Sequence, residues 1–523
     1  MKPGQRLLRR LLPLAGALAV SACTVLGPDY REPELPWLAA WQSDLYGQVA
    51  APDDPAHADL RFWWRVFDDP ALDALIEAAR HENPTLRIAG LRILESRAVL
   101  GGADAARYPQ LQQATGAVDY VNTGTSGGSL PDGDQELVSY QAGFNLAWEL
   151  DFWGRFRRAI ESADAAFLGS IANQRNGQVL LAAQVADLYY AYRTTQLRIA
   201  IARSNAEIQQ RSYEITQRIY ESGQDSELDK QQARTQYLAT LAKIPALQIT
   251  GTGLRNALCA LLGRPPGELP EIAGRPAPGA LPRVERVLLR EIPASLLLRR
   301  PDVRAAARQV AAQSAQIGVA EADFYPSIAL FGTLGWSASS LAGTPDTTTL
   351  GIGPHLSWNI FDHGLIASNV RVQDARLQQL IESYRNTALQ AAREIDDAAV
   401  SIVKTAEQAG ILDESVQASE RALEIANKRY QEGYADFQRV LDAQRALFAQ
   451  SESRLVNQGN HVSAVIALYK ALGGGWLPAT IDDVVQQDTR DSMRQRADWG
   501  GLLDAPLPEE GAAGEPKQTG STR

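Results

Sequence analysis

Two patterns of hydrophobic residues divide this chain. In the first, apolar residues alternate one by one with small or polar residues, most clearly over Ala142–Trp148 and Ile328–Trp336. In the second, apolar residues recur every three or four positions within two long stretches that contain no proline, 132–244 and 355–477. A period of two predicts β-strands with one apolar face, and spacings of three and four predict helices that pack as in coiled coils.

The two proline-free stretches predict long helical hairpins. Leu181, Val185, Leu188 and Tyr192 lie on one seam, and the helix from Gly154 to Glu221 would be roughly 100 Å long at about 1.5 Å per residue. Gly223 and Gly433 follow the first helix of each hairpin. Glycine is the residue that most readily takes the left-handed conformation that ends a helix, so each is expected to begin the turn.

The chain carries an internal duplication. Tyr108-Pro109 recurs as Tyr325-Pro326, an offset of 217, and Arg218–Gly223 resembles Lys428–Gly433, an offset of 210. A repeat of this length indicates a duplicated half-molecule. The expected boundaries are a first repeat at 61–262 (helix, strands within 108–150, hairpin 154–262), a proline-rich connector at 263–293, and a second repeat at 294–475 (helix, strands within 325–361, hairpin 364–473).

Both ends of the chain lie outside these repeats. Residues 1–22 have a basic start, an apolar run and a small-residue exit, which is typical of an export signal, and Cys23 follows at once. Val20–Cys23 therefore predicts a lipid-modified cysteine; the alternative is an ordinary signal peptide with a chance cysteine. Residues 23–60 are expected to form an extended arm, and 476–523 a polar, disordered tail.

The strands allow two interpretations. Period-two segments of about ten residues joined by long polar loops, here Val121–Ser139 and Ala338–Thr349, are typical of outer-membrane barrels. The alternative is a water-soluble antiparallel sheet with one wet face. Four strands cannot close a membrane barrel, since the smallest have about eight. If the strands cross a membrane, several chains must share one barrel, and a trimer would supply twelve strands.

Catalytic and ligand-binding chemistry is sparse. Gly124–Gly128 matches the G-x-S-x-G motif with Ser126, but it lies in a loop between two strands, whereas a nucleophile elbow needs a strand-to-helix turn. The five histidines are scattered without metal-ligand spacing, and a net charge of −10 argues against a nucleic-acid surface. Cys259 is expected to be a buried thiol, and Asp151 and Asp362 to cap helices. The sequence thus predicts no enzyme, no metal and no cofactor.

A set of motifs carries a family resemblance over about residues 23–475. They are Cys23 followed by Gly27–Tyr30, Trp63-Trp64 with Phe67–Pro70, Trp148–Gly154, Leu298–Arg304, Ser357–Asp362, and Arg429–Gly433 leading into Val440–Arg445. In this order they resemble the outer-membrane factors of resistance–nodulation–division (RND) tripartite efflux pumps. Within the TolC superfamily, the resemblance is to the lipoprotein branch of OprM and the NodT group.

The resemblance implies an α+β fold: a trimeric outer-membrane β-barrel with four strands per chain, continued by a long periplasmic α-helical barrel. It implies a passive exit duct for drugs or other small molecules, a homotrimer that works with a periplasmic adaptor and an inner-membrane RND transporter. A type I secretion duct and a lipid-anchored periplasmic coiled-coil scaffold are the alternatives.

The resemblance also implies site residues. Cys23 would carry N-palmitoyl and S-diacylglycerol groups in the outer membrane. Asp442, Arg445 and Tyr430 would form the periplasmic gate. The adaptor would contact the helical tips at Ser222, Gly223, Glu432 and Gly433.

Overall fold

The computed structural model describes residues 25–38, 45–47, 60–123, 135–223, 226–273, 279–284, 297–340 and 346–508. The chain divides into two compact units. The first comprises 1–34, 93–170 and 305–385, and the second comprises 35–92, 171–304 and 386–523. Cys23 and Ser126 lie outside the described residues.

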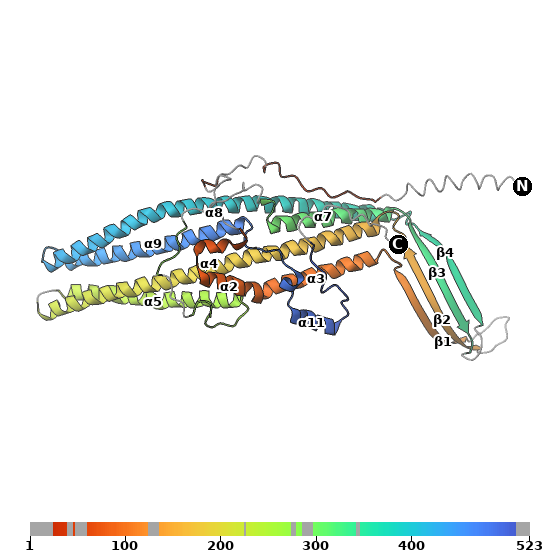
Figure 1. Cartoon of the computed structure of the whole chain (residues 1–523), viewed down its shortest axis with the longest axis horizontal. Helices are drawn as coiled ribbons and strands as arrows, with labels where there is room; N and C mark the ends of the chain where they lie inside the picture. Colours follow the sequence, from red (N-terminus) through yellow and green to blue (C-terminus); the bar gives the residue numbers. More distant parts are fainter. Residues whose placement is uncertain are drawn as a thin grey trace. The chain divides into compact units, whose positions relative to one another are not determined.

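The first unit contains one antiparallel sheet in the order β1-β2-β3-β4 (Figure 1). Its strands are β1 (Leu111–Thr123), β2 (Gln135–Glu149), β3 (Ser327–Ala338) and β4 (Thr347–Ser357). The strands extend further into the expected loops than the alternation predicted, because polar residues such as Gln135 still pair along the ladder. β1 and β4 are the two edges, so their outer backbone groups have no partner strand within this sheet.

The register confirms that one face of this sheet is the apolar one. Trp148 on β2 lies opposite Leu330 on β3, and Leu330 lies opposite Pro354 on β4. On β1 the same face carries Val118 and Tyr120, which pair with Tyr140 and Val138. The β1 pattern was weak in the sequence because its other members on this face, Gln112, Ala114 and Gly116, are small or polar.

Two helical hairpins of equal dimensions repeat along the chain (Figure 1). In the first, α4 (Arg155–Glu221) has 67 residues and α5 (Glu227–Leu261) has 35. In the second, α8 (Leu365–Gln431) and α9 (Phe437–Ala471) have the same lengths, 67 and 35, at an offset of 210. The helix α3 (Pro84–Ala105) and its counterpart α7 (Pro301–Glu321) precede the strands of each half, and η2 (Ala322–Phe324) follows α7.

Left-handed glycines end these helices at matching positions. Gly223 and Gly433 have φ of +76° and +77°, and Gly263 and Gly473 have φ of +67° and +73°. At Gly433 the N–H of Tyr434 donates to the carbonyl oxygen of Arg429, and the Gly433 N–H donates to that of Tyr430. This pair of hydrogen bonds satisfies carbonyls that the helix end would otherwise leave free. The expected glycine stops are confirmed.

A proline distinguishes the backbone of the first hairpin from that of the second. Pro245 lies inside α5, where it has no N–H to donate to the carbonyl oxygen four residues earlier, Leu241. The equivalent position in α9 is Leu455, which is buried in the second unit's core. The backbone hydrogen-bond ladder of α9 therefore keeps a bond that α5 lacks.

The second unit has a core built from the hairpins and the short helices η1 (Leu60–Phe67) and α2 (Pro70–Glu82). Trp63 stacks on Tyr469 with ring centroids 5.3 Å apart, and Phe67 contacts Tyr190 edge to face at 5.0 Å. Cys259 is a buried free thiol, as the sequence predicted.

The prediction of a disordered tail is wrong for residues 476–508. This segment forms α10 (Ile481–Val484) and α11 (Gln487–Arg496). Its polar composition conceals a few apolar residues that become buried, Val484, Val485, Met493 and Leu503. Val484 packs closely over Gly90 of α3, where a Cβ would meet its carbonyl oxygen at 2.0 Å.

Within the described residues, every helix is too short or too polar to cross a membrane.

Candidate functional site

The junction between each second strand and the following long helix is built by an aspartate. The Asp151 carboxylate accepts hydrogen bonds from the backbone N–H groups of Phe156 and Arg157, both at 3.0 Å. Asp362 accepts from Gly364 at 3.1 Å and Ile366 at 2.6 Å. These bonds to two backbone N–H groups hold the pKa of Asp362 below its usual range. The helix-capping role expected for both aspartates is confirmed.

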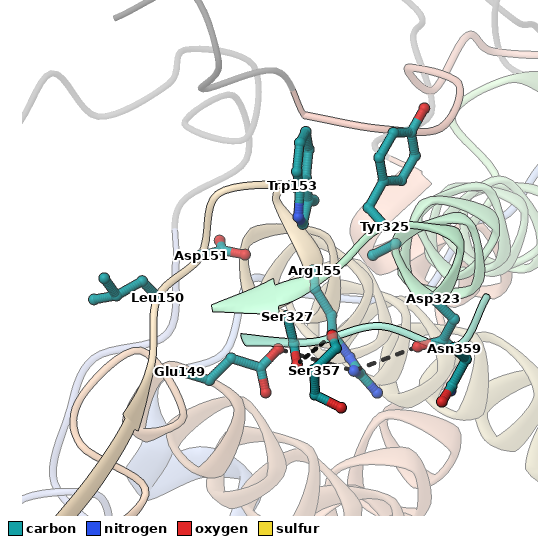
Figure 2. Close-up of a pocket in the computed structure, with 11 residues that line it drawn as sticks. Glu149, Leu150, Asp151, Trp153, Arg155, Asp323, Tyr325, Ser327, Ser357 and Asn359 are labelled. Atoms are coloured by element: carbon teal, nitrogen blue, oxygen red, sulfur yellow. Dashed lines mark hydrogen bonds and ion pairs between the residues drawn. The ribbon is translucent and has the colours of Figure 1, made fainter. Parts of the chain in front are cut away.

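A small pocket lies at the junction of the first half (Figure 2). Arg155 projects into it and pairs with Asp323 at 3.4 Å and, more weakly, with Glu149 at 4.0 Å. The indole N–H of Trp153 donates to the Pro326 carbonyl oxygen at 2.8 Å. The pocket's volume of about 90 Å³ is far below the roughly 300 Å³ of ordinary ligand sites. These contacts therefore brace one half against the other and leave no room for a drug-sized molecule.

The segment that follows Cys23 is fixed to the first unit by an arginine. Buried Arg158 donates to the carbonyl oxygens of Leu26 at 2.8 Å and Gly27 at 3.0 Å, and pairs with Asp29 at 2.8 Å. Gly27 has φ of +83° and its α-carbon lies so close to Gly318 that a Cβ on it would meet Gly318 Cα at 2.4 Å. The Gly27–Tyr30 motif thus anchors the chain just after the predicted lipidation site.

Two of the three predicted gate residues lie together on α9. Arg445 is 3.5 Å from Asp442, and their side chains are 50% and 57% exposed. Arg445 also donates to the Gln236 amide oxygen of α5 at 2.8 Å, and Asp442 accepts from Gln438 at 3.0 Å. An exposed pair of this kind contributes only about 0–1 kcal/mol to stability. Its exposed charges remain available to groups outside this chain.

Tyr430, the third predicted gate residue, lies in a different environment. Its ring contacts Phe437 at 5.2 Å between centroids and packs against the small apolar cluster near the hairpin turn, with Val440 and Leu441. The structure therefore places Tyr430 in the packing beneath α9, whereas Asp442 and Arg445 face outward from α9.

The predicted tip residues are all exposed. Ser222 and Gly223 directly follow α4, and Glu432 and Gly433 directly follow α8. Tyr434, beside Gly433, was missed by the sequence analysis although it is 77% exposed. A large exposed aromatic residue at a turn is the available signal for such a contact residue.

Two buried polar networks were also missed as functional elements, although the motifs containing them were noted. Asp69 caps α2 by accepting from the Ala71 N–H at 3.0 Å, and its other oxygen accepts from the Tyr189 hydroxyl at 2.8 Å. Burial and this hydrogen bond raise the pKa of Tyr189 to about 12. Arg300 donates to the Ala471 carbonyl oxygen at 2.6 Å and pairs with Asp302 and Glu394. The partners Asp69 and Tyr189, and Arg300 and Ala471, are too far apart in the sequence for its pattern to predict these contacts.

Among the residues that the structure describes, no cluster of three or more histidine, cysteine or acidic side chains could hold a metal ion.

Comparison with known proteins identifies a single class. The profile of the family described as "Outer membrane efflux protein" matches residues 75–264 and 292–474. The solvent efflux pump outer membrane protein SrpC of Pseudomonas putida is 32% identical over 472 residues, covering 89% of this chain and 98% of SrpC. The cation efflux system protein CusC of Escherichia coli O6:H1 is 30% identical over 470 residues, covering 89% and 99%.

The fold has solved counterparts. The outer-membrane channel OprN superimposes with a TM-score of 0.76 at 32% identity, covering 87% of this chain and 100% of OprN. The four-stranded sheet and the two long hairpins are thus an arrangement found in an outer-membrane channel.

Proposed function

Because this chain belongs to the outer membrane efflux protein family, we propose that three copies of it form the exit duct of a tripartite efflux pump. The chain is an outer-membrane efflux channel with an α+β fold, as its relatives and solved counterparts are.

The sheet edges support closure between copies. Ile352 of β4 is 89% exposed and Tyr120 of β1 is 61% exposed, although both lie on the apolar face. Free edge strands in a bilayer leave N–H and carbonyl groups without partners, which is too costly to persist. Pairing β4 of one copy with β1 of the next removes both edges, and three copies give the twelve strands of a closed barrel.

The duplication predicts a register for that pairing. β4 corresponds to β2 at an offset of 210, because Trp358 corresponds to Trp148. β3 then corresponds to β1 at an offset of 216. Leu111 of β1 lies opposite Ala147 of β2, and adding 216 and 210 to these numbers gives Ser327 and Ser357, which lie opposite each other in β3 and β4. The pairing of β4 with β1 of the next copy is the counterpart of the pairing of β2 with β3, in which Ala142 lies opposite Trp336. The counterpart of Ala142 in β4 is Ile352 and that of Trp336 in β1 is Tyr120, so Ile352 is expected opposite Tyr120 of the next copy.

The same offsets place Pro354 opposite Val118 of the next copy. All four side chains then lie on the apolar face, where cross-strand pairs of large residues stabilise a sheet. The main support for the proposed trimer is that exposed apolar side chains on β4 face exposed apolar side chains on β1 of the next copy in this register.

The other elements receive roles consistent with a duct. Asp442 and Arg445 would form a ring of charge pairs between copies at the periplasmic gate, and the exposed tips at Ser222–Gly223 and Glu432–Gly433 would contact a periplasmic adaptor. Through that adaptor the duct would work with an inner-membrane RND transporter. Lipid on Cys23, as N-palmitoyl and S-diacylglycerol groups, would anchor the segment that Arg158 holds.

The cargo proposed is a small molecule, and the duct performs no catalysis. Relatives are named for solvent and cation efflux, and their identities of 30–32% extend over 89% of this chain. Type I protein secretion has no such support among these relatives. Deleting the gene for this protein should make its host more sensitive to solvents or drugs, and expressing the protein again should restore resistance.

The trimer is tested by a disulfide across the predicted strand pair. The variant Tyr120→Cys/Ile352→Cys should form a covalently closed trimer in outer membranes under mild oxidation. The matched control Asp119→Cys/Ile352→Cys moves one cysteine to the opposite face and should cross-link poorly. Equal cross-linking by the two variants, or dimers without trimers, would overturn the proposed closure.

A further inference from the structure

An ion pair joins the first half of the chain to the second where the strands meet the long helices. Arg155, the first residue of α4, lies 3.4 Å from Asp323 of η2 and 4.0 Å from Glu149 at the end of β2 (Figure 2). Beside it, the Leu150 N–H donates to the Ile328 carbonyl oxygen at 2.9 Å, so that β2 stays paired with β3 up to the junction. The strand pairing and the ion pair therefore form one continuous contact between the two halves.

The three charged residues of this junction all have uncharged counterparts in the duplicated positions. Those on β2 and α4 have their counterparts at the offset of 210, and the one on η2 has its counterpart at the offset of 217 that relates Tyr325 to Tyr108. The counterparts are Leu365 for Arg155, Asn359 for Glu149 and Ala106 for Asp323. A change at one position alone would leave a charge without a partner, whereas the joint change leaves none.

The backbone supports this correspondence at the start of the long helices. Leu365 begins α8 directly after Gly364, which has φ of +88°, as Arg155 begins α4 directly after Gly154, which has φ of +76°. His363 before it has φ of +52°, whereas the residue before Gly154 is not left-handed. The two halves are therefore equivalent at the first helical residue but not in the turn that precedes it.

The backbone also matches on the other side of the contact. The Tyr108 N–H donates to the carbonyl oxygen three residues earlier at 3.1 Å, and the Tyr325 N–H does the same at 3.1 Å, so Ala106 takes the place of Asp323. Ala106 precedes β1 and Leu365 follows β4, and these strands are the two edges of the sheet. Although it is apolar, Leu365 is 73% exposed in a single copy.

A second ion pair between the halves shows the same pattern. The Nε atom of Arg198 on α4 donates to the Glu452 carboxylate on α9 at 3.1 Å. At the offset of 210 these residues correspond to Gln408 of α8 and Ala242 of α5, both of which are exposed in a single copy. Arg198 and Glu452 belong to the second unit, so this observation is independent of the junction in the first unit.

We propose that Leu365 of one copy packs against Ala106 of the next copy, in the place that the Arg155–Asp323 ion pair takes between the halves of a single copy. This inference rests on the proposed trimer, in which β4 of one copy pairs with β1 of the next. The contact between copies is then uncharged at the position where the contact within a copy is charged.

This difference in charge lets each half distinguish its partners. If the first half met the first half of another copy, Arg155 would lie against Ala106 and Arg198 against Ala242, and both guanidinium groups would lose their carboxylates. A partly buried charge without a partner disfavours such a contact, because nothing offsets its loss of water. The ion pairs therefore direct each first half to a second half and leave the uncharged positions for the neighbouring copy.

A disulfide tests the contact in native outer membranes. The variant Leu365→Cys/Ala106→Cys should form a covalently closed trimer under mild oxidation. The matched control Arg155→Cys/Asp323→Cys places its cysteines at the equivalent contact within one copy, so it should change the mobility of the single chain and form no covalent dimers or trimers. Cross-linking of position 365 within single chains would overturn the proposal.

The disulfide between Tyr120→Cys and Ile352→Cys separates this contact from the trimer on which it rests. If that strand disulfide closes the trimer and Leu365→Cys/Ala106→Cys does not, the contact is wrong and the trimer stands. If neither disulfide closes a trimer, the trimer itself is wrong.

Charge substitution tests the recognition. Leu365→Arg should lower the yield of the trimer trapped between positions 120 and 352 by about fivefold, because its guanidinium group would face an uncharged neighbour. Adding Ala106→Asp should restore the yield by building between copies the ion pair of the single copy, and the control Leu365→Met should leave it unchanged. A yield that Leu365→Arg does not lower, or that Ala106→Asp does not restore, would overturn the proposal.

Discussion

Trp148 and Trp358 donate the same hydrogen bond in the two halves of the chain. The indole N–H of Trp148 lies 3.0 Å from the Arg107 carbonyl oxygen, and that of Trp358 lies 2.9 Å from the Phe324 carbonyl oxygen. The donors are 210 residues apart and the acceptors 217, the two offsets found in the sequence. The duplication therefore preserves an individual contact between a tryptophan at the end of the second strand of each half and the short segment that leads from the preceding helix into the first strand.

Replacing either tryptophan by phenylalanine should have nearly the same effect. Each variant loses one hydrogen bond and keeps an aromatic ring, so each should lower the free energy of unfolding by about 1 kcal/mol. Guanidinium unfolding in detergent, followed by circular dichroism, measures this. A difference above about 1 kcal/mol between Trp148→Phe and Trp358→Phe would show that the two junctions are not equivalent.

Gly433→Ala should destabilise the hairpin tip. At φ of +77° an alanine Cβ approaches its own carbonyl oxygen, which costs about 1–2 kcal/mol. Within the described part of the chain no neighbouring atom lies within 4 Å of that Cβ, so the backbone conformation sets the cost. Amide hydrogen exchange at the end of α8 should become faster by roughly tenfold.

Gly253→Ala is the matched control for the tip variant. Gly253 lies inside α5, its added Cβ also meets no described residue within 4 Å, and its φ is not positive. Alanine there should raise the free energy of unfolding by up to about 1 kcal/mol, because glycine is the poorer helix former. Exchange that is equally fast in both variants would contradict the role assigned to the left-handed turn.

Asp187→Asn should stabilise the protein at neutral pH but not in acid. Burial raises the pKa of Asp187, although Ser463 and Lys470 oppose this, and its Oδ1 atom is buried without a hydrogen-bond partner among the residues that the structure describes. A raised pKa favours the folded state only while the carboxyl is protonated, so this contribution is lost as pH rises through the folded value.

The gain on Asp187→Asn at pH 7 should be on the order of 1 kcal/mol for each unit by which the pKa is raised. Unfolding measured from pH 4 to pH 8 should show the difference between the two proteins growing with pH. A constant difference would mean that the carboxyl is not the group that titrates.

Asp442→Ala/Arg445→Ala should increase conductance in planar bilayers. If these side chains pair between copies at the gate, removing both opens the periplasmic end, while stability within one chain changes by less than about 1 kcal/mol. The control Arg421→Ala/Glu424→Ala removes another exposed pair at the same spacing, on α8. Conductance that does not differ from the control would remove Asp442 and Arg445 from the gate.

The elements that follow from local pattern were predictable from the sequence. The long hairpins, the glycine stops at 223 and 433 and the aspartate caps each depend on residues close together in the chain. The networks around Asp69 and Arg300 were not, because Asp69 meets Tyr189 across 120 residues and Arg300 meets Ala471 across 171. The folded structure of residues 476–508 was not predicted, because the burial of a few apolar side chains is enough to fold a segment whose composition is mostly polar.

Pro245 has a mechanical consequence. The two hairpins match in length residue for residue, yet α5 lacks one backbone hydrogen bond that α9 keeps at Leu455. Bending α5 at this point costs less energy than bending α9 at its equivalent, since no bond has to stretch there. In a ring of three copies, three compliant and three stiff hairpins would alternate around the axis, so a load applied at one end would deform the wall in a threefold pattern rather than uniformly.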